Sequence, residues 1–256
     1  MLTQHKLYRL ATSHNFYPSA RLRWFASSTR CLLPTPSHGT DSPPHDHTCV
    51  SYMPARPRRV VVGITGATGT VYAIRILQIL KELNIETHLV ISKWAHATLK
   101  YETSLGAAEI TELATKSYNA RDVSAAPASG SFQHDGMIIV PCSMKTLAAV
   151  RCGLGEDLIA RAADVSLKEG RKLVLVVRET PLNDIHLDNM FTLRRAGAVI
   201  FPPVPAFYTQ PQSLNDVIDQ SVGRMLDSMG IFTDIAPRWE GFERGRTVKG
   251  QAKRTP

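Results

Sequence analysis

Short apolar runs alternate with longer segments of helical periodicity from residue 58 onward. Five runs rich in Val, Ile and Leu are too short for typical helices and predict buried strands; they cover residues 59–65, 86–92, 137–143, 172–178 and 198–201. Helices are predicted after residue 69, from about residue 93, and over 157–169, 186–196 and 213–229. This alternation predicts an α/β fold with one doubly wound parallel sheet, Rossmann-like or flavodoxin-like, in a single domain over residues 58–240.

The first 57 residues follow neither pattern. They contain six Lys or Arg residues, and no acidic residue precedes Asp41. A basic, hydroxyl-rich and acid-poor segment is typical of a mitochondrial transit peptide, and the Pro, Ser and His residues of 34–57 favour a disordered linker. We therefore expect residues 1–57 to be a transit peptide and linker that direct the protein to the mitochondrial matrix. A plain disordered tail is the alternative.

The charge is concentrated at the two ends of the chain. The formal net charge is +8, but residues 58–242 hold nineteen basic and nineteen acidic residues, so the excess lies in the leader and in a basic tail over 241–256. A nucleic-acid binder is expected to carry its basic surface on the folded domain, so the distribution argues against nucleic-acid binding. No apolar run reaches the eighteen residues expected of a membrane span.

The cysteines do not predict a metal site or a disulfide framework. Cys142 and Cys152 are ten residues apart and belong to no CxxC or Cys/His pattern, and two further cysteines lie in the leader. No histidine is near Cys142 in the sequence, so a buried, unreactive thiol is favoured over a nucleophile. We therefore expect no metal.

Ligands of doubly wound sheets bind beyond the carboxyl ends of the strands, so the residues after each predicted strand form the candidate site. GITGATG (63–69) follows the first strand. Its glycines permit close approach to a phosphate, and the start of the next helix supplies backbone N–H groups. Thr65 and Thr68 add hydroxyl donors. The segment is neither a Walker loop nor a complete GxGxxG motif, so a tight turn without a ligand stays open.

The next two strand ends carry hydroxyl groups. Ser92 and Lys93 follow the second strand, and PCSMKT (141–146) follows the third. Ser143 and Thr146 stand near the start of a helix, where they could either hold a phosphate or cap the helix, and capping is the commoner role.

Arg178 and Glu179 follow the fourth strand directly. An arginine can bind a phosphate in bidentate fashion, and a glutamate can transfer protons. A mutual salt bridge is the alternative explanation. After the fifth strand, three prolines within 202–205 fix an extended loop that carries Phe207 and Tyr208, and Arg224 follows on the last helix among apolar neighbours.

Taken together, these segments resemble the UbiX-type flavin prenyltransferases, also called phenylacrylic acid decarboxylases. They occur in family order and span residues 59 to about 240. The matching segments are GITGATG (63–69), ETHLVISK (86–93), SGSF (129–132), PCSMKTLA (141–148), RAADVSLKE (161–169), RETPL (178–182), GAVIFPPVPAFY (197–208) and PQSLNDVID (211–219).

The resemblance implies an activity. Members of this family bind FMN and transfer a dimethylallyl group to it from dimethylallyl phosphate, without a metal. The prenylated FMN then serves a separate UbiD-type decarboxylase. The family is typically dodecameric, so the resemblance also implies a homo-oligomer of that size.

The resemblance also assigns residues. It places FMN on Gly66, Ala67, Thr68, Ser92, Ser143, Met144, Lys145, Thr146 and Arg178. It places the donor on Ser129, Arg161, Lys168, Tyr208 and Arg224, with Glu102 as a nearby polar contact. Glu179 is implied as the acid/base, and Trp239 as an aromatic cover for the allyl group. Lys168 and Arg224 are implied as cations for the leaving phosphate, a role that suits fixed cations in place of a metal.

Two other functions stay open. One is an FMN-dependent cysteine decarboxylase of related fold, against which the RETP and PVPAFY segments argue. The other is a non-catalytic FMN-binding regulatory subunit, against which Glu179, Lys168 and Arg224 argue. Direct decarboxylase activity, suggested by the older family name, is the least favoured.

Overall fold

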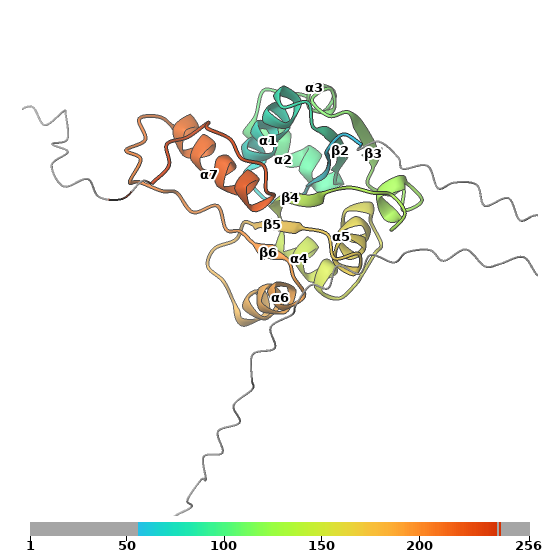
Figure 1. Ribbon diagram of the computed structural model, residues 1–256. Coiled ribbons are helices and arrows are strands. Elements are labelled where there is room, and N and C mark those ends of the chain that lie inside the picture. The colour runs from blue at the N-terminus through green and yellow to red at the C-terminus, as the bar shows by residue number, and fades with distance from the viewer. Residues whose placement is uncertain (1–55, 240, 242–256) are drawn as a thin grey trace, which may run out of the picture. The chain divides into compact units, whose positions relative to one another are not determined.

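A six-stranded parallel sheet forms the centre of the protein. The computed structural model describes residues 56–239 and 241 (Figure 1). The strands are β1 (Arg59–Ile64), β2 (Glu86–Ile91), β3 (Lys116–Asn119), β4 (Gly136–Cys142), β5 (Leu173–Val177) and β6 (Val199–Ile200). Their order across the sheet is β3-β2-β1-β4-β5-β6. This is the order of the dinucleotide-binding Rossmann sheet and differs from that of flavodoxin.

Helices cover both faces of the sheet. Three of them, α1 (Thr70–Glu82), α2 (Lys93–Glu102) and α7 (Leu214–Ser228), pack on one face, and α4 (Met144–Arg151), α5 (Leu158–Lys168) and α6 (Asp184–Arg195) pack on the other. The short helices α3 (Ala107–Thr111) and η1 (Ala126–Ala128) lie in connections. Alternate residues of one strand enter different cores: Val60 and Val62 pack with α1 and α7, while Val61 packs on the opposite face. Burial on both faces explains the continuous apolar runs.

The bounds predicted for strands and helices are confirmed within one or two residues, whereas β3 and the short helices α3 and η1 were missed. β3 has the sequence KSYN, is largely exposed, and pairs only with β2. An edge strand of polar residues has no apolar run from which to predict it. The predicted leader, apart from residues 56 and 57, and the basic tail, apart from residue 241, lie outside the described residues.

Parallel strands give the sheet two distinct edges. We use "carboxyl edge" for the side where β1, β2, β4 and β5 end, at Ile64, Ile91, Cys142 and Val177, and "amino edge" for the side where they begin. The strands that directly follow β1 in the chain, β2 and β3, lie on one side of β1, whereas β4, β5 and β6 lie on its other side. The carboxyl edge between β1 and β4 is therefore the topological switch point, where ligands of such sheets bind.

Candidate functional site

Thr65 joins the ends of β1 and β4 at the switch point. Its hydroxyl donates to the carbonyl of Pro141 at 2.7 Å and accepts from the backbone N–H of Ser143 at 2.8 Å, and its own N–H donates to Pro141 at 3.3 Å. The side chain is buried. The expectation that Thr65 offers its hydroxyl to a phosphate is therefore wrong, because that hydroxyl is already engaged between the two strands.

Gly66 is required by close packing against α2. A Cβ at this position would overlap the Cβ of Trp94 and lie 3.2 Å from the Trp94 carbonyl carbon. The glycine with positive φ is Gly69 (φ 105°), immediately before α1. The sequence predicted that Gly66 makes room for a phosphate; the structure gives contact with Trp94 as the reason for glycine.

The start of α1 is closed by Glu102 from the end of α2. Its carboxylate accepts hydrogen bonds from the backbone N–H groups of Gly69 (2.9 Å) and Thr70 (2.8 Å) and from the Thr70 hydroxyl (2.7 Å). Partial burial acts to raise the pKa of Glu102, but hydrogen bonds from Thr68, Thr70 and Gly69 hold it below its ordinary value. Glu102 is thus a helix cap beside the glycine loop, in which Gly66 and Thr68 are exposed and Ala67 is half-buried.

Two further helices begin at the same edge. Ser92 caps α2 by accepting from the N–H of Ala95 at 3.2 Å, and Ser143 caps α4 by accepting from the N–H of Thr146 at 3.3 Å. The capping role weighed for Ser143 is confirmed. The starts of α2 and α4 therefore lie at the carboxyl edge and direct backbone N–H groups and positive dipole ends toward it, which suits a phosphate, whereas the start of α1 is already capped by Glu102.

Arg178 and Glu179 leave β5 at the carboxyl edge with exposed side chains. The backbone N–H of Arg178 donates to Cys142 at 3.2 Å, which holds the end of β5 beside the start of α4. Within the described part of the chain neither side chain forms a salt bridge, and the Glu179 carboxylate accepts from the N–H of Thr180 at 3.0 Å. The alternative of a mutual ion pair is therefore wrong, and both charged groups are available to a ligand.

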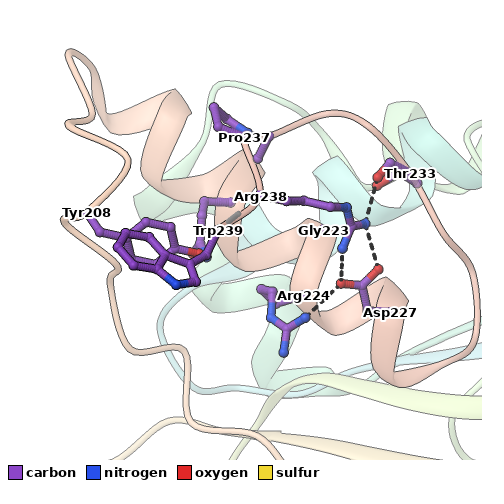
Figure 2. Close-up of a pocket in the computed structure, with 10 residues that line it drawn as sticks. Tyr208, Gly223, Arg224, Asp227, Thr233, Pro237, Arg238 and Trp239 are labelled. Atoms are coloured by element: carbon purple, nitrogen blue, oxygen red, sulfur yellow. Dashed lines mark hydrogen bonds and ion pairs between the residues drawn. The ribbon is translucent and has the colours of Figure 1, made fainter. Parts of the chain in front are cut away.

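Tyr208, Arg224 and Trp239 line one pocket of about 390 Å³ (Figure 2). The rings of Tyr208 and Trp239 meet edge to face, with centroids 5.5 Å apart and planes at 78°. Arg224 projects from α7 with an exposed side chain and pairs with Asp227 at 2.9 Å. The sequence placed these three residues at one donor site, and the structure brings them together.

Ser129, Arg161 and Lys168 form a separate cluster. The guanidinium of Arg161 donates to the carbonyl of Ala128 at 3.2 Å and pairs with Asp164 at 2.8 Å. The Lys168 ammonium pairs with Glu169, and both lie so close to Gly130 that a Cβ there would collide with them. Lys168 is the last residue of α5, and β5 begins five residues later at Leu173, so Lys168 lies toward the amino edge of the sheet.

One chain does not bring Lys168 and Arg224 into a single pocket. Lys168 is on α5 and Arg224 on α7, and these helices pack on opposite faces of the sheet (Figure 1). Lys168 is also separated from Arg178 by the whole of β5, which at about 3.3 Å per residue is roughly 17 Å. The prediction of one pocket containing Lys168, Tyr208 and Arg224 is wrong for an isolated chain, because helical periodicity alone does not show which face of the sheet a helix covers.

The sequence analysis missed four residues around these clusters. Asp227 and Arg238 hold Arg224 and the segment before Trp239. Glu169 pairs with Lys168, and Arg171 donates to the carbonyls of Gly130 (2.7 Å) and Phe132 (2.8 Å) in the SGSF segment. Two of these contacts could be read from the sequence: Asp227 stands three residues after Arg224 on one helix, and Glu169 directly follows Lys168. The contacts of Arg238 and Arg171 join segments whose spacing follows no motif.

Cys142 is buried, and burial raises its pKa to about 12. The prediction that Cys142 is buried is confirmed, and its raised pKa disfavours the reactive thiolate. Within residues 56–239 and 241, no group of three or more His, Cys, Asp or Glu side chains is arranged to hold a metal ion. None of the helices in this part of the chain has the length and apolar character of a membrane span.

Comparison with known proteins decides the family. The profile of the Flavoprotein family matches residues 50–237. The mitochondrial flavin prenyltransferase PAD1 of Saccharomyces cerevisiae is 62% identical over 214 residues, which cover 84% of this chain and 88% of the relative. The chain belongs to the UbiX-type flavin prenyltransferases. The bacterial flavin prenyltransferase LpdB of Lactiplantibacillus plantarum is 51% identical over 72% of this chain and 99% of its own.

Solved structures of UbiX and UbiX-like proteins agree with this family. A crystal structure of AnUbiX (PadA1) in complex with FMN and dimethylallyl pyrophosphate matches with a TM-score of 0.73 and 58% identity, over 73% of this chain and all of that one. A dodecameric FMN-dependent UbiX-like decarboxylase of Escherichia coli O157:H7 matches with a TM-score of 0.70 and 51% identity, over 72% of this chain and all of that one. The cypemycin decarboxylase CypD, at 15% identity and a TM-score of 0.51, shares the fold alone.

Proposed function

We propose that this flavin prenyltransferase transfers a dimethylallyl group from dimethylallyl phosphate to reduced FMN, and that the prenylated FMN serves a UbiD-type decarboxylase. The observation that carries the proposal is the 62% identity to the yeast enzyme over 84% of the chain. The 58% identical structure with FMN and dimethylallyl pyrophosphate supports the two ligand classes. The cysteine decarboxylase and regulatory-subunit alternatives have no comparable support: the cypemycin decarboxylase CypD, at 15% identity, shares the fold alone.

The carboxyl edge suits FMN. The phosphate would lie against the backbone of Gly66, Ala67 and Thr68 and the starts of α2 and α4, which supply N–H groups from one direction. Arg178 adds a cation that no described carboxylate neutralises. The full set that we assign to FMN is Gly66, Ala67, Thr68, Ser92, Ser143, Met144, Lys145, Thr146 and Arg178. FMN supplies the reduced ring that accepts the allyl group.

The remaining residues suit the donor. Arg224 and Lys168 would bind the phosphate and stabilise its charge as the allyl–oxygen bond breaks. The faces of Tyr208 and Trp239 would stabilise positive charge on the allyl group. The exposed carboxylate of Glu179 would remove the proton that the acceptor ring loses. Ser129 and Arg161 lie beside Lys168 and would complete the anion site.

Such a site requires more than one copy of the chain. Lys168 and Arg224 lie on opposite faces of the sheet, so we propose that a donor pocket takes Lys168 from one copy and Arg224 from another. A closed oligomer repeats such a pocket around its axes. The dodecameric UbiX-like relative supports an assembly of that size.

A mass measurement tests the activity. Purified full-length protein is incubated with reduced FMN and dimethylallyl phosphate, and the flavin is analysed by mass spectrometry. We expect a flavin heavier by one dimethylallyl group, with EDTA having no effect. Parallel reactions with dimethylallyl diphosphate, a cysteine-terminated thiol substrate and phenylacrylic acid identify the donor and test the decarboxylase alternatives. Unmodified flavin in every reaction would contradict the proposal.

We propose a mitochondrial location from the composition of residues 1–57, supported by the mitochondrial yeast relative. A fusion of residues 1–57 to a fluorescent reporter is expected to enter mitochondria. A control fusion with the five leader arginines replaced by glutamine is expected to stay in the cytosol. Cytosolic fluorescence of the unaltered fusion would contradict the proposal.

A further inference from the structure

Asp227 lies between two arginines on the wall of the Tyr208–Trp239 pocket (Figure 2). One of its oxygens accepts from Arg224 at 2.9 Å and from Arg238 at 2.8 Å, and the other accepts from Arg238 at 2.9 Å. The Asp227 side chain is 11% exposed, whereas those of Arg224 and Arg238 are 59% and 48% exposed. The carboxylate is thus a nearly buried anchor for two cations that extend toward solvent.

Arg238 uses this anchor to fasten the C-terminal segment onto α7. Besides its bidentate contact with Asp227, it donates to the carbonyl of Thr233 at 2.7 Å, so it closes the segment 233–238 back on itself. The next residue is Trp239, whose ring meets Tyr208 from the loop after β6. One carboxylate therefore connects α7, the C-terminal segment and, through Trp239, the proline-rich loop.

The charges leave the pocket suited to an anion. Two guanidinium groups share one carboxylate, so this group of three carries one net positive charge. The hydrogen bond from Arg238 is the largest of the contacts that hold the pKa of Asp227 below its ordinary value, so the carboxylate is ionised near neutral pH. A long arginine side chain loses considerable rotamer freedom when it binds, and an ion pair that already orients Arg224 reduces that cost.

We propose that Asp227 is a positioning residue for the donor: it orients Arg224 toward the donor phosphate and, through Arg238, holds Trp239 against Tyr208. The inference rests on the proposed function, which assigns Arg224 and Trp239 to the donor. Asp227 and Arg238 do not themselves touch the reacting atoms. The Asp227 carboxylate thus holds both Arg224, which we assign to the phosphate, and, through Arg238, Trp239, which we assign to the allyl group.

Fluorine NMR of the full chain tests the coupling. The three tryptophans are labelled as 5-fluorotryptophan, and Trp239 is assigned by its loss in Trp239→Phe. We expect Asp227→Asn and Arg238→Gln each to shift the Trp239 resonance and to raise the donor KM about tenfold, the scale of a lost hydrogen bond to a charged group. The Kd for FMN is expected to stay unchanged. The double variant is expected to have a donor KM no higher than that of either single variant, because the two residues act together. Arg238→Lys, which keeps the positive charge, is expected to raise the donor KM less than Arg238→Gln does.

Asp219→Asn is the matched control. Asp219 is on the same helix and pairs with Arg75 of α1 at 2.6 Å, so its ion pair holds neither Arg224 nor Arg238. We expect it to leave the Trp239 resonance and the donor KM unchanged. If Asp227→Asn does not fold, Arg238→Gln, which alters a half-exposed side chain, carries the test alone.

The outcomes separate this inference from the proposed function. A rise in donor KM in Arg224→Ala, with no change of KM or Trp239 resonance in Arg238→Gln, overturns the inference and leaves the donor assignment standing. If Asp219→Asn shifts the Trp239 resonance and the donor KM as much as Asp227→Asn does, the inference is overturned as well, because the effect is then a general loss of helix packing. An unchanged donor KM in Arg224→Ala overturns the donor assignment itself.

Discussion

The carboxylate of Glu102 accepts the backbone N–H groups of Gly69 and Thr70 at the start of α1, from a position 33 residues further along the chain. It supplies from another helix the cap that Gly69 lacks a side chain to provide. A negative group at this end of a helix is stabilised by the helix dipole. The contact therefore fixes the glycine loop between β1 and α1 relative to α2.

Replacing Glu102 by Gln is expected to loosen this loop. The loss of a charged helix cap typically costs about 1–2 kcal/mol, and the Kd for FMN is expected to rise because the loop lies at the carboxyl edge, where we propose that FMN binds. Since the pKa of Glu102 is lowered in the folded state, its contribution is present near neutral pH and lost as the pH falls through that pKa. Urea unfolding and flavin fluorescence titration measure both effects. Glu82→Gln, an exposed residue on α1, is the control, and equal stability of the two variants would contradict the prediction.

Gly66→Ala is expected to destabilise the protein by about 1–3 kcal/mol, because the new Cβ would force the start of α2 away. The overlap is with the Cβ of Trp94, which every residue except glycine carries. A second change to Trp94→Ala is therefore expected to give no rescue, whereas Trp94→Gly is expected to restore part of the stability. Thermal unfolding of these three variants and of the unaltered protein checks this. Equal rescue by alanine and glycine would show that the indole ring, and not the Cβ, sets the requirement.

Glu179→Gln is expected to reduce kcat by about 10²–10⁴ while FMN and donor still bind, as for the loss of a general acid/base. Glutamine keeps an oxygen for the N–H of Thr180, so the local backbone contact survives. Single-turnover kinetics with reduced FMN measures the effect, and urea unfolding serves as the control. A normal kcat accompanied by lower stability would give Glu179 a structural role instead.

Mixed oligomers test whether the donor pocket is shared between copies. Lys168→Ala and Arg224→Ala proteins are each expected to be nearly inactive with dimethylallyl phosphate. After denaturation and joint refolding at equal amounts, about a quarter of pockets formed between two copies receive both wild-type residues, so activity is expected to return to that level. Refolding each variant alone is the control. No recovery in the mixture would contradict a donor pocket that takes Lys168 from one copy and Arg224 from another.

His134 is expected to make the protein less stable in mild acid. Burial lowers the pKa of His134 to about 4, and its Nδ1–H donates to the carbonyl of Gly136 at 3.1 Å. The unfolded chain takes up this proton near pH 6.5 and the folded chain only near pH 4, so stability falls by up to about 3 kcal/mol as the pH drops through this window. His134→Asn, whose amide can replace the Nδ1–H, is expected to reduce the difference in the free energy of unfolding between pH 5 and pH 7, measured by urea unfolding. His96→Asn is the exposed control, and a profile for His134→Asn as steep as that of the unaltered protein would refute the assignment.

The apolar pattern predicted most of the fold because strands buried on both faces leave continuous runs of Val, Ile and Leu. It also placed Arg178 and Ser143 at one edge, since parallel strands end together. The pattern could not place Lys168 relative to Arg224, because it records neither the strand order nor the face that each helix covers. It could not reveal Glu102 as a cap of α1, or Asp227 as the partner of Arg238, because these contacts form only when separate helices and loops pack.

Thr65 has a consequence for ligand affinity. Its three hydrogen bonds hold the ends of β1 and β4 together in the chain alone, so the base of the proposed FMN site at the carboxyl edge is formed before a ligand arrives. A preorganised surface does not have to be ordered on binding, and less of the contact energy is offset by lost conformational entropy. Flavin affinity is then governed by the contacts themselves, and the association rate is not slowed by folding of the two loops.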